Sequence, residues 1–175
     1  MKKVYKPTNG IPSFYQGYMD LVPDDGNLLQ HLQDILNETE QLVSTLSEEQ
    51  LNYRYSEGKW TIKDILVHLS DCERVITYRA MRIGRGDTTD LPGFDENLLV
   101  QNANAGSRDI PGILKELSAQ RNASKAFIET FDDASLNRVG TANSYAISAR
   151  LLVNHVYGHH KHHLNTIKER YLSTY

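Results

Sequence analysis

The chain has 175 residues, of which 39% are hydrophobic and 23% charged, with a formal net charge of -3 and a pI near 6.1. This is the size and composition of one ordinary globular domain, residues 1–175. The acidic balance argues against a nucleic-acid partner, and no apolar run is long enough to cross a membrane. A single cysteine excludes an internal disulfide, and the N-terminus lacks the apolar segment of a signal peptide. These features predict a cytoplasmic protein.

Residues 1–23 hold three of the five prolines and are expected to form an irregular lead-in. Apolar residues then recur with the three-and-four spacing of an amphipathic helix from about Asn27 to residue 46, and a polar connector follows. A second helix is expected over residues 60–84. Thr61 is its predicted N-cap, with Asp64 in the first turn, and Gly84 is its predicted end.

A turn-rich loop leads to a third predicted helix, which begins near Ser107 or Ile110 and runs to about Phe131. Pro111 suits the first turn of this helix, where its missing N–H does no harm. The last helix is expected over residues 145–172. No segment alternates with period two for long enough to predict a strand. Four helices of roughly 20 residues or more predict an all-α fold, a four-helix bundle.

Five of the seven histidines lie in the last helix, in the stretch NHVYGHHKHHLNTIKERY. Each helical residue turns about 100° from the one before it, so the apolar residues of this helix define a direction toward the bundle core. These apolar residues are Ala149, Leu152, Val156 and Ile167. His163 lies about 20° from that direction, His160 about 40° and His159 about 60°. His155 and His162 lie about 100° or more away and are expected nearer solvent. The geometry leaves His159 and His160 as alternatives beside His163.

Histidines four apart, such as His159 and His163, can aim both imidazoles at one ion, as HExxH zinc helices do. The three-residue spacing of His160 and His163 allows the same. A catalytic divalent metal usually takes three protein ligands and keeps a position for water. His68, at the edge of the apolar stripe of the second helix, is the candidate for the third. The competing interpretation is a solvated polar face without chemistry, and His31 is expected to be structural or exposed.

These motifs resemble the DinB-like (DinB/YfiT) superfamily of metal-binding four-helix bundles. EGKWTIKDILVHLSDCERVITYRAMRIGRGD is similar to the second-helix motif of that family, LPGFDENLLV to the following loop and GHHKHHLNTIKERYL to its C-terminal histidine motif. With YMDLVP near the start and QRNASKAFIETF in the third helix, the likeness covers nearly the whole chain in order. The resemblance implies an up-down-down-up bundle, often a homodimer.

The resemblance also implies that His68, His159 and His163 are the metal ligands, and it favours His159 over His160. His160 and His162 are then expected outside the coordination of the metal. Zinc or nickel is the expected metal, with iron, manganese or copper as alternatives, because imidazole suits most of these ions. A low-molecular-weight thiol such as bacillithiol or mycothiol is the co-substrate that some members of the family use.

The expected substrate is a small molecule, and three hypotheses describe what the protein does. The first is a thiol-dependent S-transferase in stress or detoxification, in which the metal binds the thiol as thiolate. The second is a metal-dependent hydrolase that uses water activated by the metal. The third is a non-catalytic bundle that binds metal or a partner.

Other residues near the predicted site have competing interpretations. Asp64 and Asp71 lie one turn on either side of His68 and could accept a hydrogen bond from its imidazole, although Asp64 also suits the helix start. Arg79 and Arg85 could recognise an anionic substrate, or could be solvated or paired.

For Asp71, Glu73 and Arg74, a surface ion-pair network or a dimer contact competes on equal terms with a role in the pocket. Cys72 is expected to be a small core residue, and Trp60 is expected to pack against the start of the second helix.

Overall fold

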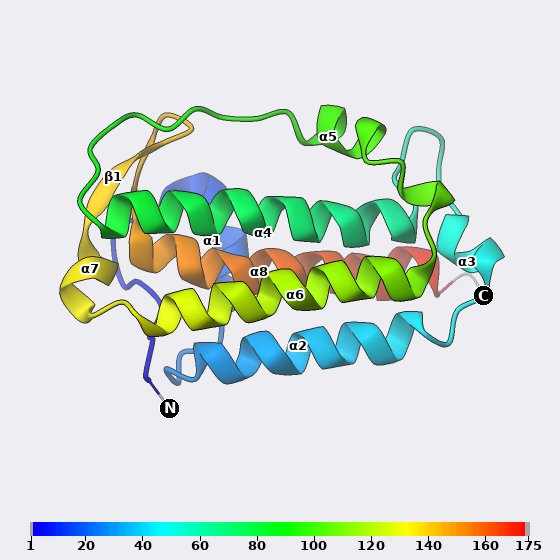
Figure 1. Ribbon diagram of the computed structural model, residues 1–175, viewed down its shortest axis with the longest axis horizontal. Helices are drawn as coiled ribbons and strands as arrows, with labels where there is room; N and C mark the ends of the chain where they lie inside the picture. The colour runs from blue at the N-terminus through cyan, green and yellow to red at the C-terminus, as the bar shows by residue number, and fades with distance from the viewer. Residues whose placement is uncertain (1, 174–175) are drawn as a thin grey trace.

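The structure of the protein is a computed structural model, which describes residues 2–173 (Figure 1). Four long helices, α2, α4, α6 and α8, form the bundle, and shorter elements connect them. In chain order the elements are α1 (Ser13–Asp20), α2 (Leu28–Val43), α3 (Glu48–Asn52), α4 (Ile62–Gly84), α5 (Glu96–Asn102), η1 (Ala105–Ser107), α6 (Ile110–Glu129), α7 (Asp133–Asn137), β1 (Val139–Ala142), β2 (Tyr145–Ser148), α8 (Ala149–Thr166) and η2 (Ile167–Tyr171).

The long helices have up-down-down-up topology. In Figure 1, α2 and α8 run in one direction and α4 and α6 run in the other. α4 packs against α6 and α8, and α2 packs against the same two helices. Because α4 and α6 are parallel, the chain between them returns along the whole length of the bundle, and this crossover places α5 against α4. The predicted all-α four-helix bundle is confirmed.

The long helices α4, α6 and α8 begin at side-chain caps that the local sequence provides, whereas Asn27 at the start of α2 makes no such hydrogen bond. Thr61 accepts a hydrogen bond from the backbone N–H of Asp64, and the Asp64 carboxylate accepts one from the backbone N–H of Thr61, which makes a capping box. Asp109 caps α6 ahead of Pro111, and Ser148 caps α8. Each such cap contributes about 1 kcal/mol to stability. The predicted start of α4 is therefore confirmed.

Two hydrophobic clusters fill the bundle, one toward each end. On α4, Leu69 and the apolar residues before it belong to one cluster, whereas Cys72 and the apolar residues after it belong to the other. His68 and Glu73 are buried polar residues of α4 that lie close to the level where the two clusters meet. These two polar side chains are thus held between two apolar clusters.

The region before α8 corrects one prediction. β1 and β2 form an antiparallel hairpin, and α8 begins at Ala149 and not at residue 145. Asn143 and Ser144 at the turn both have positive φ, 51° and 66°, as a tight hairpin turn of two residues requires. Strands of four residues are too short for a period-two pattern to stand out, so the prediction that the chain has no strand was wrong.

The lead-in also differs from the prediction, because α1 occupies the middle of it. This helix packs against α8 and buries Tyr15 and Met19. Its eight residues are too few for a convincing helical periodicity. As described below, α1 covers the histidine-bearing part of α8.

No helix in residues 2–173 combines the length and the apolar character needed to cross a bilayer.

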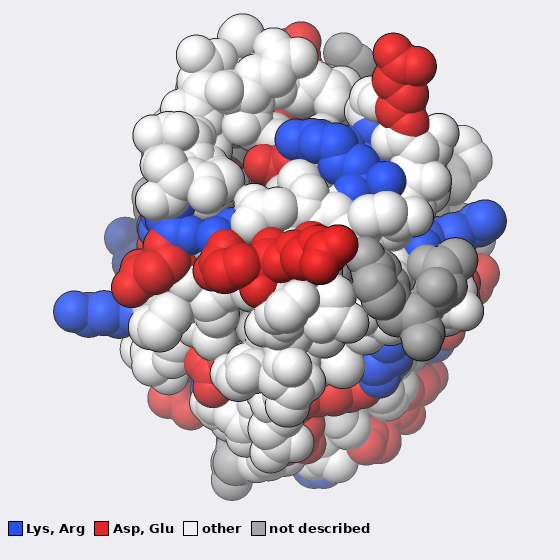
Figure 2. Space-filling model, turned by 90° about the vertical axis from the view of Figure 1, so that its right-hand side faces the viewer, with Lys and Arg blue, Asp and Glu red and all other residues white. Residues whose placement is uncertain are grey.

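Figure 2 looks onto the end of the bundle that carries α3 and the start of α4. Acidic and basic side chains both occur on this end, with uncharged surface between them, and neither sign forms a broad patch.

Candidate metal centre

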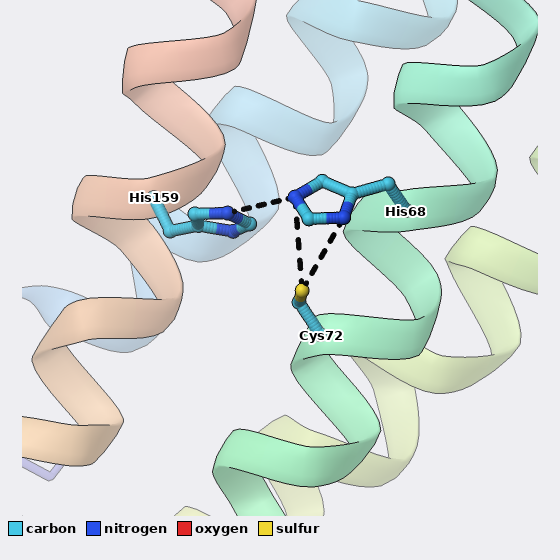
Figure 3. A group of neighbouring side chains, drawn as sticks. All are labelled: His68, Cys72 and His159. Atoms are coloured by element: carbon cyan, nitrogen blue, oxygen red, sulfur yellow. Dashed lines mark hydrogen bonds between the residues drawn. The ribbon is translucent and has the colours of Figure 1, made fainter. Parts of the chain in front are cut away.

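The three histidines predicted to bind metal lie together between α4 and α8. Nε2 of His159 is 3.1 Å from Nε2 of His68 and 3.1 Å from Nε2 of His163. The rings of His68 and His163 have their centroids 4.9 Å apart. In Figure 3, His68 and His159 point toward one another from their two helices. Folding brings these side chains together; that they bind a metal stays a prediction.

The two Nε2 contacts of His159 fit a metal ion, whereas the donor atoms that all lie within 4.8 Å of one another belong to His68, Cys72 and His159. A neutral imidazole carries only one ring proton, so one Nε2 atom facing two others cannot satisfy every contact with good hydrogen bonds. An ion between the rings would accept a lone pair from each. Ligand nitrogens about 2.0–2.1 Å from a tetrahedral zinc ion lie roughly 3.3–3.4 Å from one another. The observed Nε2 separations of 3.1 Å are close to that spacing.

Burial keeps these imidazoles in the form that binds metal. It lowers the pKa of His68 to about 4 and the pKa of His163 to about 3, where the neighbouring His68 adds to the effect. The pKa of His159 is held well below its usual value by burial and then by the surrounding histidines. At neutral pH all three rings are therefore uncharged, as metal ligation requires.

Cys72 supplies a further donor atom in this cluster. Its Sγ lies 3.5 Å from Nδ1 and 3.7 Å from Nε2 of His68, one turn away on α4 (Figure 3). Donor atoms of His68, Cys72 and His159 all lie within 4.8 Å of one another, and all three residues are buried. Burial raises the pKa of the Cys72 thiol, and the charges of Glu96 and Asp71 add to this. Cys72 is in the core as predicted, but it also lies where a metal ligand could lie.

Aromatic side chains cover the cluster on two sides. The Trp60 ring lies 4.5 Å from that of His68 and is stacked 6.2 Å from that of His163. Tyr18 of α1 lies 5.9 Å from the His159 ring. Trp60 was expected only to pack against the start of α4, and its contact with the histidines was not predicted. A tryptophan just before an N-cap carries no signal that would reveal such a contact.

Two separate hollows adjoin the cluster, each at a different histidine. The smaller one, here called the arginine cavity, has a volume of about 70 Å³ and includes His159. The larger one, here called the tryptophan groove, has a volume of about 450 Å³ and includes His163 and Trp60. The arginine cavity is lined by Phe14, Tyr15, Tyr18, Cys72, Ile76, Arg79, Phe94, Glu96, Asn143, His155 and His159. A still larger hollow, about 740 Å³, lies beside residues 5–10 and contains none of the seven histidines.

The two aspartates considered near His68 have other partners. Asp64 caps α4 and pairs with Arg54 at 3.1 Å. Asp71 pairs with the exposed Arg74 at 2.8 Å, and Arg74 also pairs with Glu116. Neither aspartate forms a hydrogen bond with a histidine in the described part of the chain. The structure therefore supports the helix-start explanation for Asp64 and the surface ion pair for Asp71.

The prediction for His155 was wrong. His155 is only 6% exposed, because the rings of Tyr15 and Tyr18 pack against it with centroids 4.9 Å and 4.7 Å away. Both tyrosines belong to α1, and helical geometry on α8 alone could not reveal that another helix covers this face.

His162 is exposed, as predicted. His31 lies on α2 and pairs with Asp25 at 2.9 Å.

His160 lies outside the three-histidine cluster, in a separate buried network. Arg121 donates to both carboxylate oxygens of Glu73, to the carbonyl oxygen of Leu32 and, at 2.8 Å, to Nδ1 of His160. Nδ1 must therefore accept, so the ring proton is on Nε2, which donates to the Thr39 hydroxyl at 2.9 Å. The expectation of a surface or pocket role for Glu73 was wrong, because this residue is 3% exposed and paired in the core.

Comparison with solved structures supports the fold. YfiT from Bacillus subtilis, described as a probable metal-dependent hydrolase with an unusual four-helix bundle topology, superposes with a TM-score of 0.74 at 20% identity, over 98% of this chain and 94% of that one. The mycothiol-dependent maleylpyruvate isomerase superposes with a TM-score of 0.58 at 11% identity, over 86% of this chain and 62% of that one. No curated protein matches the sequence.

The family model of the DinB superfamily matches residues 31–167. This range includes α4 and α8, and with them His68, His159 and His163. The resemblance seen in the sequence motifs and the topology of the bundle agree with this match. The chain belongs to the DinB superfamily.

Proposed function

We propose that this protein is a metal-dependent S-transferase in which His68, His159 and His163 hold one divalent ion, zinc or nickel. A divalent ion supplies Lewis-acid chemistry and lowers the pKa of a thiol or water that it binds. The remaining tasks, which are to admit two substrates, orient them and exclude water, fall to the side chains around the cluster.

The observation that carries this proposal is that two separate hollows reach the three-histidine cluster, each at a different histidine. His159 lines the arginine cavity, and His163 lines the tryptophan groove. A transfer reaction needs two substrates to meet at one point from different sides, whereas hydrolysis needs one substrate and water. The tryptophan groove, at about 450 Å³, falls in the size range of small-molecule sites, roughly 300–1,000 Å³.

The charges of the tryptophan groove suit an acidic low-molecular-weight thiol. Lys59 and Arg170 contribute cationic side chains to it, and it contains no aspartate or glutamate. Trp60 lines this groove and packs against the rings of both His68 and His163. A thiol bound in this groove would reach the histidines past Trp60, and the second substrate would approach from the arginine cavity.

A metal-dependent hydrolase is the second candidate, and Glu96 is the observation that favours it. This carboxylate lines the arginine cavity together with His159. Desolvation raises its pKa, and the neighbouring Asp95 adds to this. A carboxylate with a raised pKa is a better general base near neutral pH. The description of YfiT as a probable metal-dependent hydrolase agrees with this alternative.

Metal analysis tests the centre itself. Protein purified without a nickel resin is reconstituted with zinc or nickel, desalted, and analysed for wild type, His163→Ala and Cys72→Ala. We expect one ion per chain in wild type and Cys72→Ala and less than a tenth of that in His163→Ala. Loss of metal in Cys72→Ala with full occupancy in His163→Ala would assign the third ligand to Cys72. Full occupancy in both variants would contradict the proposed centre.

Activity assays then separate the two reactions. The reconstituted enzyme is given low-molecular-weight thiols with an aromatic halide electrophile, and separately a panel of esters and amides. We expect thiol conjugation that stops in a chelator, with no ester or amide turnover. Chelator-sensitive ester or amide turnover without thiol would establish the hydrolase, whereas full metal occupancy without either activity would favour a non-catalytic bundle.

A further inference from the structure

The arginine cavity contains a buried positive charge with no negative partner. Arg79 of α4 is only 6% exposed, donates from Nη2 to the carbonyl oxygen of Pro92 at 2.6 Å, and lies over the Phe94 ring at 5.4 Å. No carboxylate in residues 2–173 forms an ion pair with it. Burying a charge is costly unless an opposite charge compensates it. The other buried arginine of the bundle, Arg121, has such a partner in Glu73.

His155 borders the same cavity and is also unpartnered. It is 6% exposed, its Nδ1 atom is fully buried, and neither ring nitrogen has a hydrogen-bond partner among the described residues. Burial lowers its pKa to about 3, and the charge of Arg79 adds to this. A neutral imidazole retains one N–H that can donate to an anion without a change of charge.

Charges of both signs line the cavity, Arg79 and the exposed Glu96. The pKa of His155 is lowered by burial and then by the charge of Arg79, whereas the pKa of Tyr18 is raised by burial and then by the Glu96 carboxylate. A water needs roughly 10–15 Å³ of such volume, so a cavity of about 70 Å³ holds a few waters or one small anionic group. A whole substrate does not fit.

We propose that Arg79 and His155 form a subsite for a carboxylate group of the second substrate, beside the candidate metal centre. The proposal rests on the function proposed above, because it assigns the charged end of the electrophile that meets the thiol. His159 belongs to the lining of the same cavity. A carboxylate held at Arg79 would place the adjoining atoms of its molecule beside His159, one of the three histidines.

A binding experiment on metal-free protein tests the subsite without any catalysis. Formate, the smallest carboxylate, is titrated into protein labelled with ¹⁵N-histidine, with chloride at equal ionic strength as reference. We expect a saturable shift of the His155 ring signals in wild type and its loss in Arg79→Gln. Arg85→Gln is the matched control, because Arg85 is exposed at the end of the same helix and lines neither hollow beside the histidines. This control should bind formate like wild type.

Two results would overturn the subsite: no formate-dependent change at His155 in wild type, or the same saturable change in Arg79→Gln. If Arg79→Gln does not fold, Arg79→Lys decides. Lysine keeps the charge but loses the forked geometry that matches a carboxylate. We expect it to bind formate at least threefold more weakly, and binding equal to wild type would count against the subsite.

A kinetic experiment extends the test to turnover. Two electrophiles are compared that differ only in a carboxylate and its methyl ester. Loss of a hydrogen bond to a charged group costs about 1.5–3 kcal/mol, so Arg79→Gln should raise KM for the acid about tenfold or more and leave KM for the ester within twofold. Equal effects on both would refute the assignment. If wild type turns over neither compound, the transferase proposal fails, and the formate titration still decides the subsite.

Discussion

His159 and His160 are neighbours in the sequence, yet they belong to two buried clusters of opposite character. His159 faces α4, and its Nε2 atom lies 3.1 Å from two other imidazole nitrogens. His160 receives a hydrogen bond from Arg121 on one ring nitrogen and donates to Thr39 from the other. Both residues are buried, so burial alone does not distinguish them.

The difference lies in whether the polar atoms are satisfied within the chain. In the network of Glu73, Arg121, His160 and Thr39, each charge has a partner, and the network links α2, α4, α6 and α8. Such a network orders the interior and has no capacity left for a ligand. The three-histidine cluster has too few protons for its contacts, and the arginine cavity has an uncompensated cation. We therefore propose these two places, and not the satisfied network, as the ligand sites of this fold.

The largest expected effect comes from breaking the satisfied network. Arg121→Leu leaves the Glu73 carboxylate buried without its partner, and breaking such a pair costs about 3–5 kcal/mol. Urea unfolding of the metal-free protein should show this loss. Arg74→Ala is the control, because Arg74 makes an exposed pair of the kind worth less than about 1 kcal/mol. A loss below 1 kcal/mol for Arg121→Leu would show that the network contributes little to the stability of the fold.

The next effect is on the pH dependence of the metal-free protein. Burial holds the pKa of His68 near 4 and the pKa values of His155 and His163 near 3, below the unfolded value near 6.5. Between the folded pKa values and the unfolded value, the unfolded chain binds more protons than the folded chain. The free energy of unfolding therefore falls as pH falls. Between pH 7.5 and pH 5.5 we expect each of these three histidines to lower the free energy of unfolding by on the order of 1 kcal/mol. Urea unfolding at the two pH values measures this change. A flat profile would mean that these rings are hydrated or charged in the folded state.

Removing a predicted ligand should have a somewhat smaller effect, seen only when metal is present. A ligand at 100 times its Kd stabilises a protein by about 2.7 kcal/mol. His68→Ala should lose nearly all bound metal and with it about 2–3 kcal/mol of metal-dependent stability. Thermal unfolding of wild type and variant, each with and without zinc, measures this. Zinc stabilisation equal to that of wild type would contradict the role of His68.

The smallest effect is expected at His162. This residue is exposed and lies beside the cluster without joining it. His162→Ala should keep full metal occupancy and change the free energy of unfolding by less than about 0.5 kcal/mol, as is usual for surface substitutions. Loss of metal in this variant would mean that the coordination includes a side chain that the structure places outside it.

Much of the fold was predictable because its signals are local. The spacing of apolar residues and the cap at Thr61 identify the long helices, and both depend only on neighbours in the sequence. The four-residue spacing of His159 and His163 likewise follows from the helix alone. The hairpin before α8 and the helix α1 were missed because they are short, and short elements leave little periodic signal.

The sequence by itself determined a four-helix bundle with histidines on the inner side of two helices, because helical periodicity sets which side chains share a face. Only the tertiary structure decided which partner each buried group meets. It turned His159 toward α4 and His160 toward Arg121 and Thr39, covered His155 with α1, and left Arg79 without an ion pair to any carboxylate of residues 2–173. These outcomes depend on contacts between segments far apart in the chain, and no local pattern specifies them.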